Sequence, residues 1–133
     1  MAEAQLPDDA RRLDDETLRA MLALAYVSFN TRDIDTVLSL LHEDVAWPNG
    51  MEGGYVHGHA AVRAYWVRQW KMIDPRVDPI DYVRERDGRV RVEVHQAVRS
   101  LGGELLADQM IHHVFTVEAG RIRTMEIRAV PTP

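Results

Sequence analysis

The chain has 133 residues, of which 46% are hydrophobic and 28% are charged, with a formal net charge of −5 and no cysteine. This is the composition of a globular protein of one-domain size, and it excludes disulfides, thiolate metal sites and cysteine nucleophiles. The acidic balance argues against a nucleic-acid partner, which requires a basic surface, and gives no reason to expect a membrane partner. The start of the chain lacks the apolar core of a secretory signal, and the longest apolar stretch, Ala20 to Val27, is too short to span a bilayer, so we expect a cytoplasmic location.

Two helices are predicted after a flexible N-terminal arm over residues 1–13. Asp14 is a typical N-cap residue, and the apolar side chains after it fall on one helical face: Leu18, Leu22, Ala25 and Phe29. A second, shorter helix begins near Asp33. Its apolar residues have the i, i+3, i+4, i+7 spacing of an amphipathic helix: Ile34, Val37, Leu38 and Leu41.

A short strand, a glycine-rich loop and a third helix follow. Val45–Trp47 has the composition of a strand, which Pro48 ends. The loop over residues 49–58 carries glycines at four positions and is expected to be mobile or tightly turned. The third helix is predicted over residues 59–73 and ends at Asp74-Pro75.

The second half of the chain predicts four antiparallel strands, over residues 79–86, 89–100, 104–117 and 121–128. Asp87-Gly88 is a two-residue hairpin signal, and glycine-containing turns join the later strands. Alternate residues of the second strand share one apolar face: Val90, Val92, Val94, Gln96 and Val98. Long strands coil, and amphipathic helices then cover the concave face. We therefore expect an α+β fold: one domain over residues 14–130, in which a cone-shaped curved antiparallel sheet of four long strands and a short one wraps around three N-terminal helices.

Four segments carry a resemblance to a known family: Arg32–Asp35, Leu41–Val45, Gly58–Arg63 and Phe115–Ile122. Together with the order of elements, they resemble the nuclear transport factor 2-like superfamily, close to its SnoaL-like polyketide cyclase and ketosteroid isomerase branches. The resemblance covers about residues 18–128. It implies a pocket inside the cone, a homodimer formed through the sheet and no cofactor. Members include isomerases, dehydratases, cyclases and proteins without a known reaction, so the fold alone does not select a function.

The ketosteroid isomerase residues are not reproduced in this chain. Where those enzymes have an Asp general base followed by Pro, the chain has Trp47 and Pro48. The oxyanion-hole Tyr aligns near Ala25, with Tyr26 beside it, and the oxyanion-hole Asp aligns with His113. We therefore expect negligible ketosteroid isomerase activity.

Two polar residues lie on apolar strand faces and are candidates for the site. His113 shares its face with Ile111 and Phe115; it is either an acid–base group in the pocket or a hydrogen-bonded core histidine. Gln96 either binds a ligand carbonyl or satisfies a buried backbone group. In the glycine-rich loop, Glu52 is a second catalytic candidate if the loop folds over a ligand, and otherwise a solvated residue.

Aromatic residues predict the wall of a pocket for a flat apolar ligand, although each also fits ordinary core packing. The candidates for ligand binding are Trp47, Tyr55, Trp66, Trp70 and Phe115, with Asn49 on the loop. The histidines at positions 57 and 59 and at 112 and 113 do not have the spacing of metal ligands with an accompanying carboxylate, so no metal is expected.

These observations leave two functions open. The first is a SnoaL-like protein that binds a small, largely apolar molecule in its cone and acts as a cofactor-free isomerase, dehydratase or cyclase through acid–base chemistry. The second is a non-catalytic ligand-binding or dimeric scaffold protein, which the absence of the Asp base favours.

Overall fold

The computed structural model describes residues 13–131, so the predicted arm over residues 1–13 lies outside them apart from Leu13. The helices and strands, in chain order, are α2 (Asp15–Asn30), α3 (Ile34–Ser39), β1 (Leu41–Pro48), β2 (Tyr55–His57), α4 (Gly58–Trp70), β3 (Ile73–Arg84), β4 (Val90–Ser100), β5 (Leu105–Glu118) and β6 (Arg121–Ala129). The first of these helices begins as predicted, because the carboxylate of Asp14 accepts a hydrogen bond of 2.7 Å from the Thr17 amide. No helix within residues 13–131 has the length and apolar character needed to cross a membrane.

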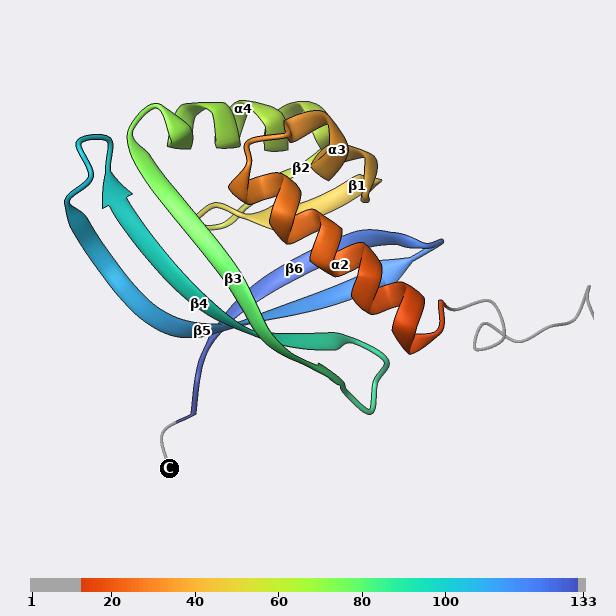
Figure 1. Cartoon of the computed structure of the whole chain (residues 1–133). Helices are drawn as coiled ribbons and strands as arrows, with labels where there is room; N and C mark the ends of the chain where they lie inside the picture. The colour runs from red at the N-terminus through yellow and green to blue at the C-terminus, as the bar shows by residue number, and fades with distance from the viewer. Residues whose placement is uncertain (1–12, 132–133) are drawn as a thin grey trace, which may run out of the picture.

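The strands form one six-stranded sheet in the order β2-β1-β6-β5-β4-β3. The four long strands are an antiparallel meander, and Figure 1 shows them curving around the helices. Each pair of long strands contains one register shift, between Pro79 and Asp81, between Val98 and Arg99, and between Thr116 and Val117. Such bulges increase the local twist of a sheet. The expected α+β fold with a curved sheet and N-terminal helices is confirmed.

The region around β1 differs from the prediction. Leu41, which the sequence pattern assigns to the second helix, is the first residue of β1 and is fully buried. The strand joins β6 in parallel, so the sheet is not antiparallel throughout, and the Ile122 amide donates to the carbonyl of Leu40 at 2.9 Å. β2 pairs with β1 where only a loop was expected. These pairings join residues far apart in the chain, and local periodicity carries no information about them.

The boundary between α4 and β3 also differs. The helix ends at Trp70, three residues early, and β3 begins at Ile73 rather than at residue 79. Pro75 and Pro79 therefore lie within a strand. This is possible because β3 is at the edge of the sheet, where a missing amide donor interrupts no second ladder.

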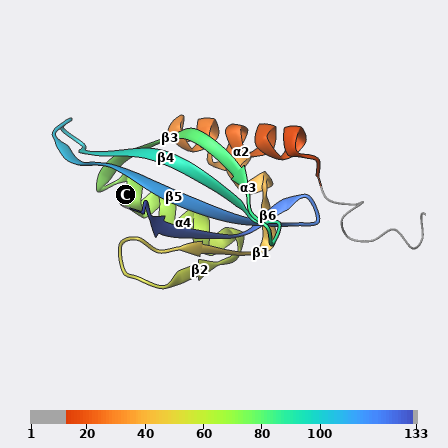
Figure 2. The same cartoon turned by 90° about the horizontal axis from the view of Figure 1, so that it is seen from below.

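The two faces of the meander have opposite character. The predicted alternation in β4 is confirmed, because Val90, Val92 and Val94 are buried while the residues between them are partly exposed. On the outer face, paired arginines and glutamates cover the sheet, and Val114 beneath them is fully buried. Figure 2 shows that the turn joining β4 and β5 projects beyond the remainder of the fold.

Candidate functional site

A pocket of about 120 Å³, partly open to solvent, lies between the helices and the concave face of the sheet. For scale, an apolar cavity of roughly 150 Å³ holds a benzene molecule. The helices contribute Ala25, Tyr26, Phe29, Val37, Tyr65, Trp66 and Gln69 to its lining, and the strands and the loop after β1 contribute Leu41, Trp47, Pro48, Gly50, Pro75, Val77, Gln96, His113, Phe115, Ile122, Met125 and Ile127. Most of these side chains are apolar. The exposed members, Gly50 and Ile127, mark the mouth.

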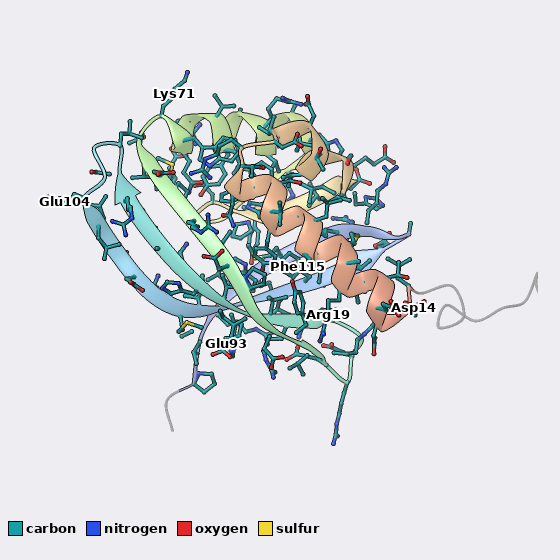
Figure 3. All side chains as sticks on the ribbon, viewed as in Figure 1. Asp14, Arg19, Lys71, Glu93, Glu104 and Phe115 are labelled. Carbon is teal, nitrogen blue, oxygen red and sulfur yellow. The ribbon has the colours of Figure 1, made fainter. Side chains whose placement is uncertain are left out.

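Two polar side chains meet inside this apolar lining. The hydroxyl of Tyr26, from α2, is 2.8 Å from Nδ1 of His113, on the inner face of β5. The two rings are stacked with centroids 5.8 Å apart and planes within 6°. Phe115, which Figure 3 shows between α2 and the sheet, packs edge-on against both rings. Both polar residues are almost completely buried.

Burial keeps both members of this pair uncharged near neutral pH. It lowers the pKa of the His113 imidazole from 6.5 to about 4. Burial also raises the pKa of the Tyr26 hydroxyl well above its ordinary value, and the neighbouring Tyr82 adds to that shift. The pair is therefore a neutral phenol bonded to a neutral imidazole.

A neutral imidazole has one donor and one acceptor nitrogen, so the direction of the hydrogen bond between Tyr26 and Nδ1 determines whether Nε2 is a donor or an acceptor. If the hydroxyl donates to Nδ1, Nε2–H of His113 is a donor; if Nδ1–H donates to the hydroxyl oxygen, Nε2 is an acceptor and the hydroxyl proton is free to donate elsewhere. Of the two ring nitrogens of His113, only Nδ1 has a hydrogen-bond partner among the described residues. Nε2 is thus the atom left for a ligand.

Aromatic rings form one wall of the pocket. Trp66 is 1% exposed and stands perpendicular to Trp47, with ring centroids 5.2 Å apart. Phe29 packs against Trp66 at 5.6 Å. Trp70 does not line the pocket: it stacks behind Trp66 at 6.1 Å, and its buried Nε1 has no hydrogen-bond partner. The Arg32 guanidinium lies 5.0 Å from the centroid of the Trp70 ring.

Amide side chains and a second tyrosine add polar atoms nearer the mouth. Gln96 lines the pocket, and its Oε1 accepts a bond of 2.9 Å from Gln109, which leaves its own NH₂ group as a donor. The hydroxyl of Tyr65 accepts from the Gly50 amide at 3.0 Å and from Gln69 at 3.2 Å. A Cβ atom at position 50 would lie 3.4 Å from that hydroxyl, which is within ordinary van der Waals contact.

The candidates on the loop after β1 do not reach the pocket. Glu52 is mostly exposed, forms an ion pair of 2.8 Å with Arg68 and accepts from the Asn49 side chain at 3.2 Å. Asn49 Oδ1 accepts from the amides of Met51 and Glu52, so its role here is to shape the turn. Tyr55 is on the edge strand β2 and is 48% exposed.

The structure thus brings together five of the predicted residues and leaves four outside the lining. Trp47, Trp66, Gln96, His113 and Phe115 surround one space. Sequence reasoning did not assign Tyr26, Tyr65 or Gln69 to the site. Tyr26 carried a usable signal, because it lies four residues after Leu22 and so places a hydroxyl on the apolar face of its helix. Within residues 13–131, no three His, Asp or Glu side chains gather as metal ligands would.

The family model described as "SnoaL-like domain" matches residues 19–125 of the chain. TerC, in a crystal structure with polyporic acid, is 31% identical with a TM-score of 0.72, over 86% of this chain and 91% of that one. An NTF2-like protein of unknown function from Burkholderia pseudomallei is 29% identical with a TM-score of 0.74, over 86% and 91%. A candidate polyketide cyclase from Xanthomonas campestris, 21% identical with a TM-score of 0.72 over 84% and 89%, supports the fold alone. No match was found among curated proteins.

Proposed function

The chain belongs to the family of SnoaL-like domains, and from that premise we propose that it binds a small, flat, mainly apolar molecule through an oxygen atom held at the Tyr26–His113 pair. The observation that carries the proposal is this hydrogen-bonded pair inside an otherwise apolar pocket. Ligand sites are typically lined by apolar and aromatic side chains with a few placed polar groups that set orientation. The ligand class that fits is an aromatic or enone compound carrying a carbonyl or hydroxyl group.

The size of the pocket limits what is buried. A volume of about 120 Å³ accommodates about one aromatic ring, by comparison with the benzene cavity above. Trp47 and Trp66 offer ring surfaces against which such a ring can pack. The remainder of a larger ligand would extend through the mouth at Gly50 and Ile127, past the donor amide of Gln96.

The relative TerC supports this ligand class. It is 31% identical to this chain and was crystallised with polyporic acid. That compound is a quinone with hydroxyl groups and phenyl substituents, so it combines flat apolar rings with the oxygen atoms that a polar pair can bind. We take the class of compound, rather than polyporic acid itself, as the proposal for this chain.

Binding is favoured over catalysis by the chemistry of the pair. An efficient general base has a pKa near the working pH, whereas burial lowers the pKa of His113 to about 4, which makes it a weak base. None of the described lining residues is a carboxylate that could act as its partner. A cofactor-free isomerase, dehydratase or cyclase is the second candidate, favoured by one observation: the Tyr26 hydroxyl lies 2.8 Å from Nδ1 of His113, a contact in which either group can donate the proton.

The resemblance also implies assembly, and we propose that two copies pair through the outer face of the sheet in the cytoplasm. That face is not uniformly polar, since Met110 is 39% exposed on it, among charged residues. Sedimentation velocity at micromolar concentration should show a dimer. A monomer there would contradict this part of the proposal.

The function is tested by comparing 4-ethylphenol with ethylbenzene, which differ by one hydroxyl group. Ligand entry should change tryptophan emission, because Trp47 and Trp66 line the pocket. The protein should bind the phenol more tightly, and His113→Leu should weaken phenol binding by roughly tenfold while ethylbenzene binds as well or better. A co-structure would then identify the contacts. Failure of both compounds to bind, or an unchanged preference in folded His113→Leu protein, would contradict the proposal.

A further inference from the structure

The lining of the pocket carries no fixed charge. Among the described residues that surround it there is no Asp, Glu, Lys or Arg. Its titratable groups are Tyr26 from α2, Tyr65 from α4 and His113 from β5. The faces that β1, β3, β4 and β6 present to it contribute apolar side chains and the amide of Gln96.

Two cations that lie over aromatic rings of the lining are already paired. Arg32 lies 5.5 Å from the centroid of the Phe29 ring, but its guanidinium binds the Asp74 carboxylate and the carbonyl of Pro75. Arg68 lies 6.0 Å from the centroid of the Tyr65 ring and is held by Glu52. Each cation is therefore balanced by a neighbouring carboxylate, and neither is left to neutralise an anion inside the pocket.

An acidic ligand of the proposed class would find no counter-ion in this lining. A phenolate, enolate or hydroxyquinone anion loses its hydration on entry, and a buried charge without a counter-ion is strongly unfavourable. His113 is the one basic side chain among the described lining residues, and no described residue forms a hydrogen bond with its Nε2.

We propose that the pocket takes an acidic phenol, enol or hydroxyquinone together with one proton, held between the ligand oxygen and Nε2 of His113, so that the occupied site has no net charge. The proton comes from the solvent, and the ligand anion and the proton combine into a neutral complex without any further bond change. This inference rests on the proposed function and specifies the ligand class and the state in which it binds.

The hydrogen bond to Tyr26 suits this role. If the proton stays on the ligand oxygen, Nε2 accepts a hydrogen bond from that oxygen while Nδ1–H donates to the hydroxyl oxygen of Tyr26. If the proton lies on Nε2, the imidazolium still donates through Nδ1–H to the same oxygen. In the empty pocket the imidazole is neutral at physiological pH, because burial holds its pKa at about 4. Binding of the ligand anion must therefore take up the proton from the solvent.

The experiment uses 4-nitrophenol, whose ordinary pKa is close to neutrality, and 4-nitroanisole, its uncharged methyl ether. Calorimetry is run in two buffers with different heats of ionisation, at a pH above the pKa of the phenol. We expect uptake of about one proton per 4-nitrophenolate bound, and an affinity that falls about tenfold for each further unit of pH. The ether should bind without proton uptake and independently of pH.

Two substitutions test whether the proton is held at His113. His113→Leu should weaken 4-nitrophenol binding by roughly tenfold or more and leave 4-nitroanisole unaffected. The matched control is His112→Leu, which makes the same change one residue away on the opposite face of β5 and should alter neither ligand. If His113→Leu does not fold, His113→Gln replaces it with the same expected loss.

The possible outcomes distinguish failure of this inference from failure of the proposed function. Binding of 4-nitrophenolate without proton uptake would overturn the inference and leave the proposed function standing. Proton uptake and affinity unchanged in the His113 variant would remove His113 from the role. If neither nitro compound binds, both proposals are wrong.

Discussion

The two faces of the same sheet solve the burial of polar groups in opposite ways. On the inner face, His113 is bonded to Tyr26 and both are neutral. On the outer face, polar side chains remain in contact with solvent: Nε2 of His95 lies 2.6 Å from the Asp108 carboxylate, and Arg91 forms an ion pair of 2.9 Å with Glu85. The difference shows that solvent access, rather than residue type, decides how a polar side chain is used in this fold.

The largest expected effect comes from forcing a charge onto the inner face. Val94 is fully buried, so Val94→Lys places an ammonium group without a partner in the core and should lower the free energy of unfolding by about 4 kcal/mol or more. Ala97→Lys, on the outer face of the same strand, should change it by less than about 0.5 kcal/mol. Urea titrations measure both. Equal losses for the two variants would show that the faces do not differ as described.

Acid should lower the stability of the fold through His113 on the inner face. His113 has a pKa of 6.5 when unfolded and about 4 when folded, so the unfolded state binds more protons between these values. The stability from keeping this imidazole neutral is complete above pH 6.5 and is lost as the pH falls toward 4, by about 3 kcal/mol in total. Denaturant melts across this range should show the loss, and His113→Leu should reduce it. A wild-type slope retained in full by the variant would contradict the assignment.

A smaller effect is expected from breaking the polar pair itself. Tyr26→Phe keeps the ring and removes the hydroxyl, so Nδ1 of His113 is left buried without a partner. The free energy of unfolding should fall by about 1–2 kcal/mol, as measured by thermal or urea denaturation. Tyr82→Phe is the control, because no hydrogen bond of the Tyr82 hydroxyl is found within residues 13–131. A loss as large in the control would mean that the bond to His113 contributes little.

The smallest effect belongs to the outer face. Arg91→Ala removes the ion pair with Glu85, which has two further arginines, Arg89 and Arg128, at 3.8 Å. Because these side chains are partly solvated, the loss should stay below about 1 kcal/mol and should shrink in added salt. Urea titrations at low and high ionic strength provide the measurement. A larger loss of unfolding free energy that does not depend on salt would show that this ion pair behaves like the buried interactions of the inner face.

Much of the meander could be predicted from the sequence, because its signals are local. The alternation of Val90, Val92 and Val94 lies within the strand that it specifies. Asp87-Gly88 marks the turn between β3 and β4, but the connection is longer than the predicted two residues, because β3 ends at Arg84 and β4 begins at Val90. The parallel pairing of β1 with β6 and the edge strand β2 depend on segments far apart in the chain, and no periodicity encodes them.

The candidate site divides in the same way. The inward orientation of His113 follows from strand alternation, and the structure agrees. Its contact with Tyr26 joins positions 87 residues apart and depends on how α2 crosses the sheet. Glu52 was placed near the pocket by the position of its loop, but the nearby Arg68 on α4 holds it at the surface.

The unclosed sheet has two free edges, and both are poorly suited to adding another strand. β3 interrupts its row of outward amide groups with Pro75 and Pro79, bulges after the second proline, and carries Asp74, Asp78 and Asp81. β2, at the other end, is three residues long. Prolines, bulges, charges and short length are the features by which sheet proteins avoid aggregation through their edges. Copies of this chain at high concentration are therefore protected against strand-by-strand polymerisation, and their faces remain as the surfaces through which they can associate.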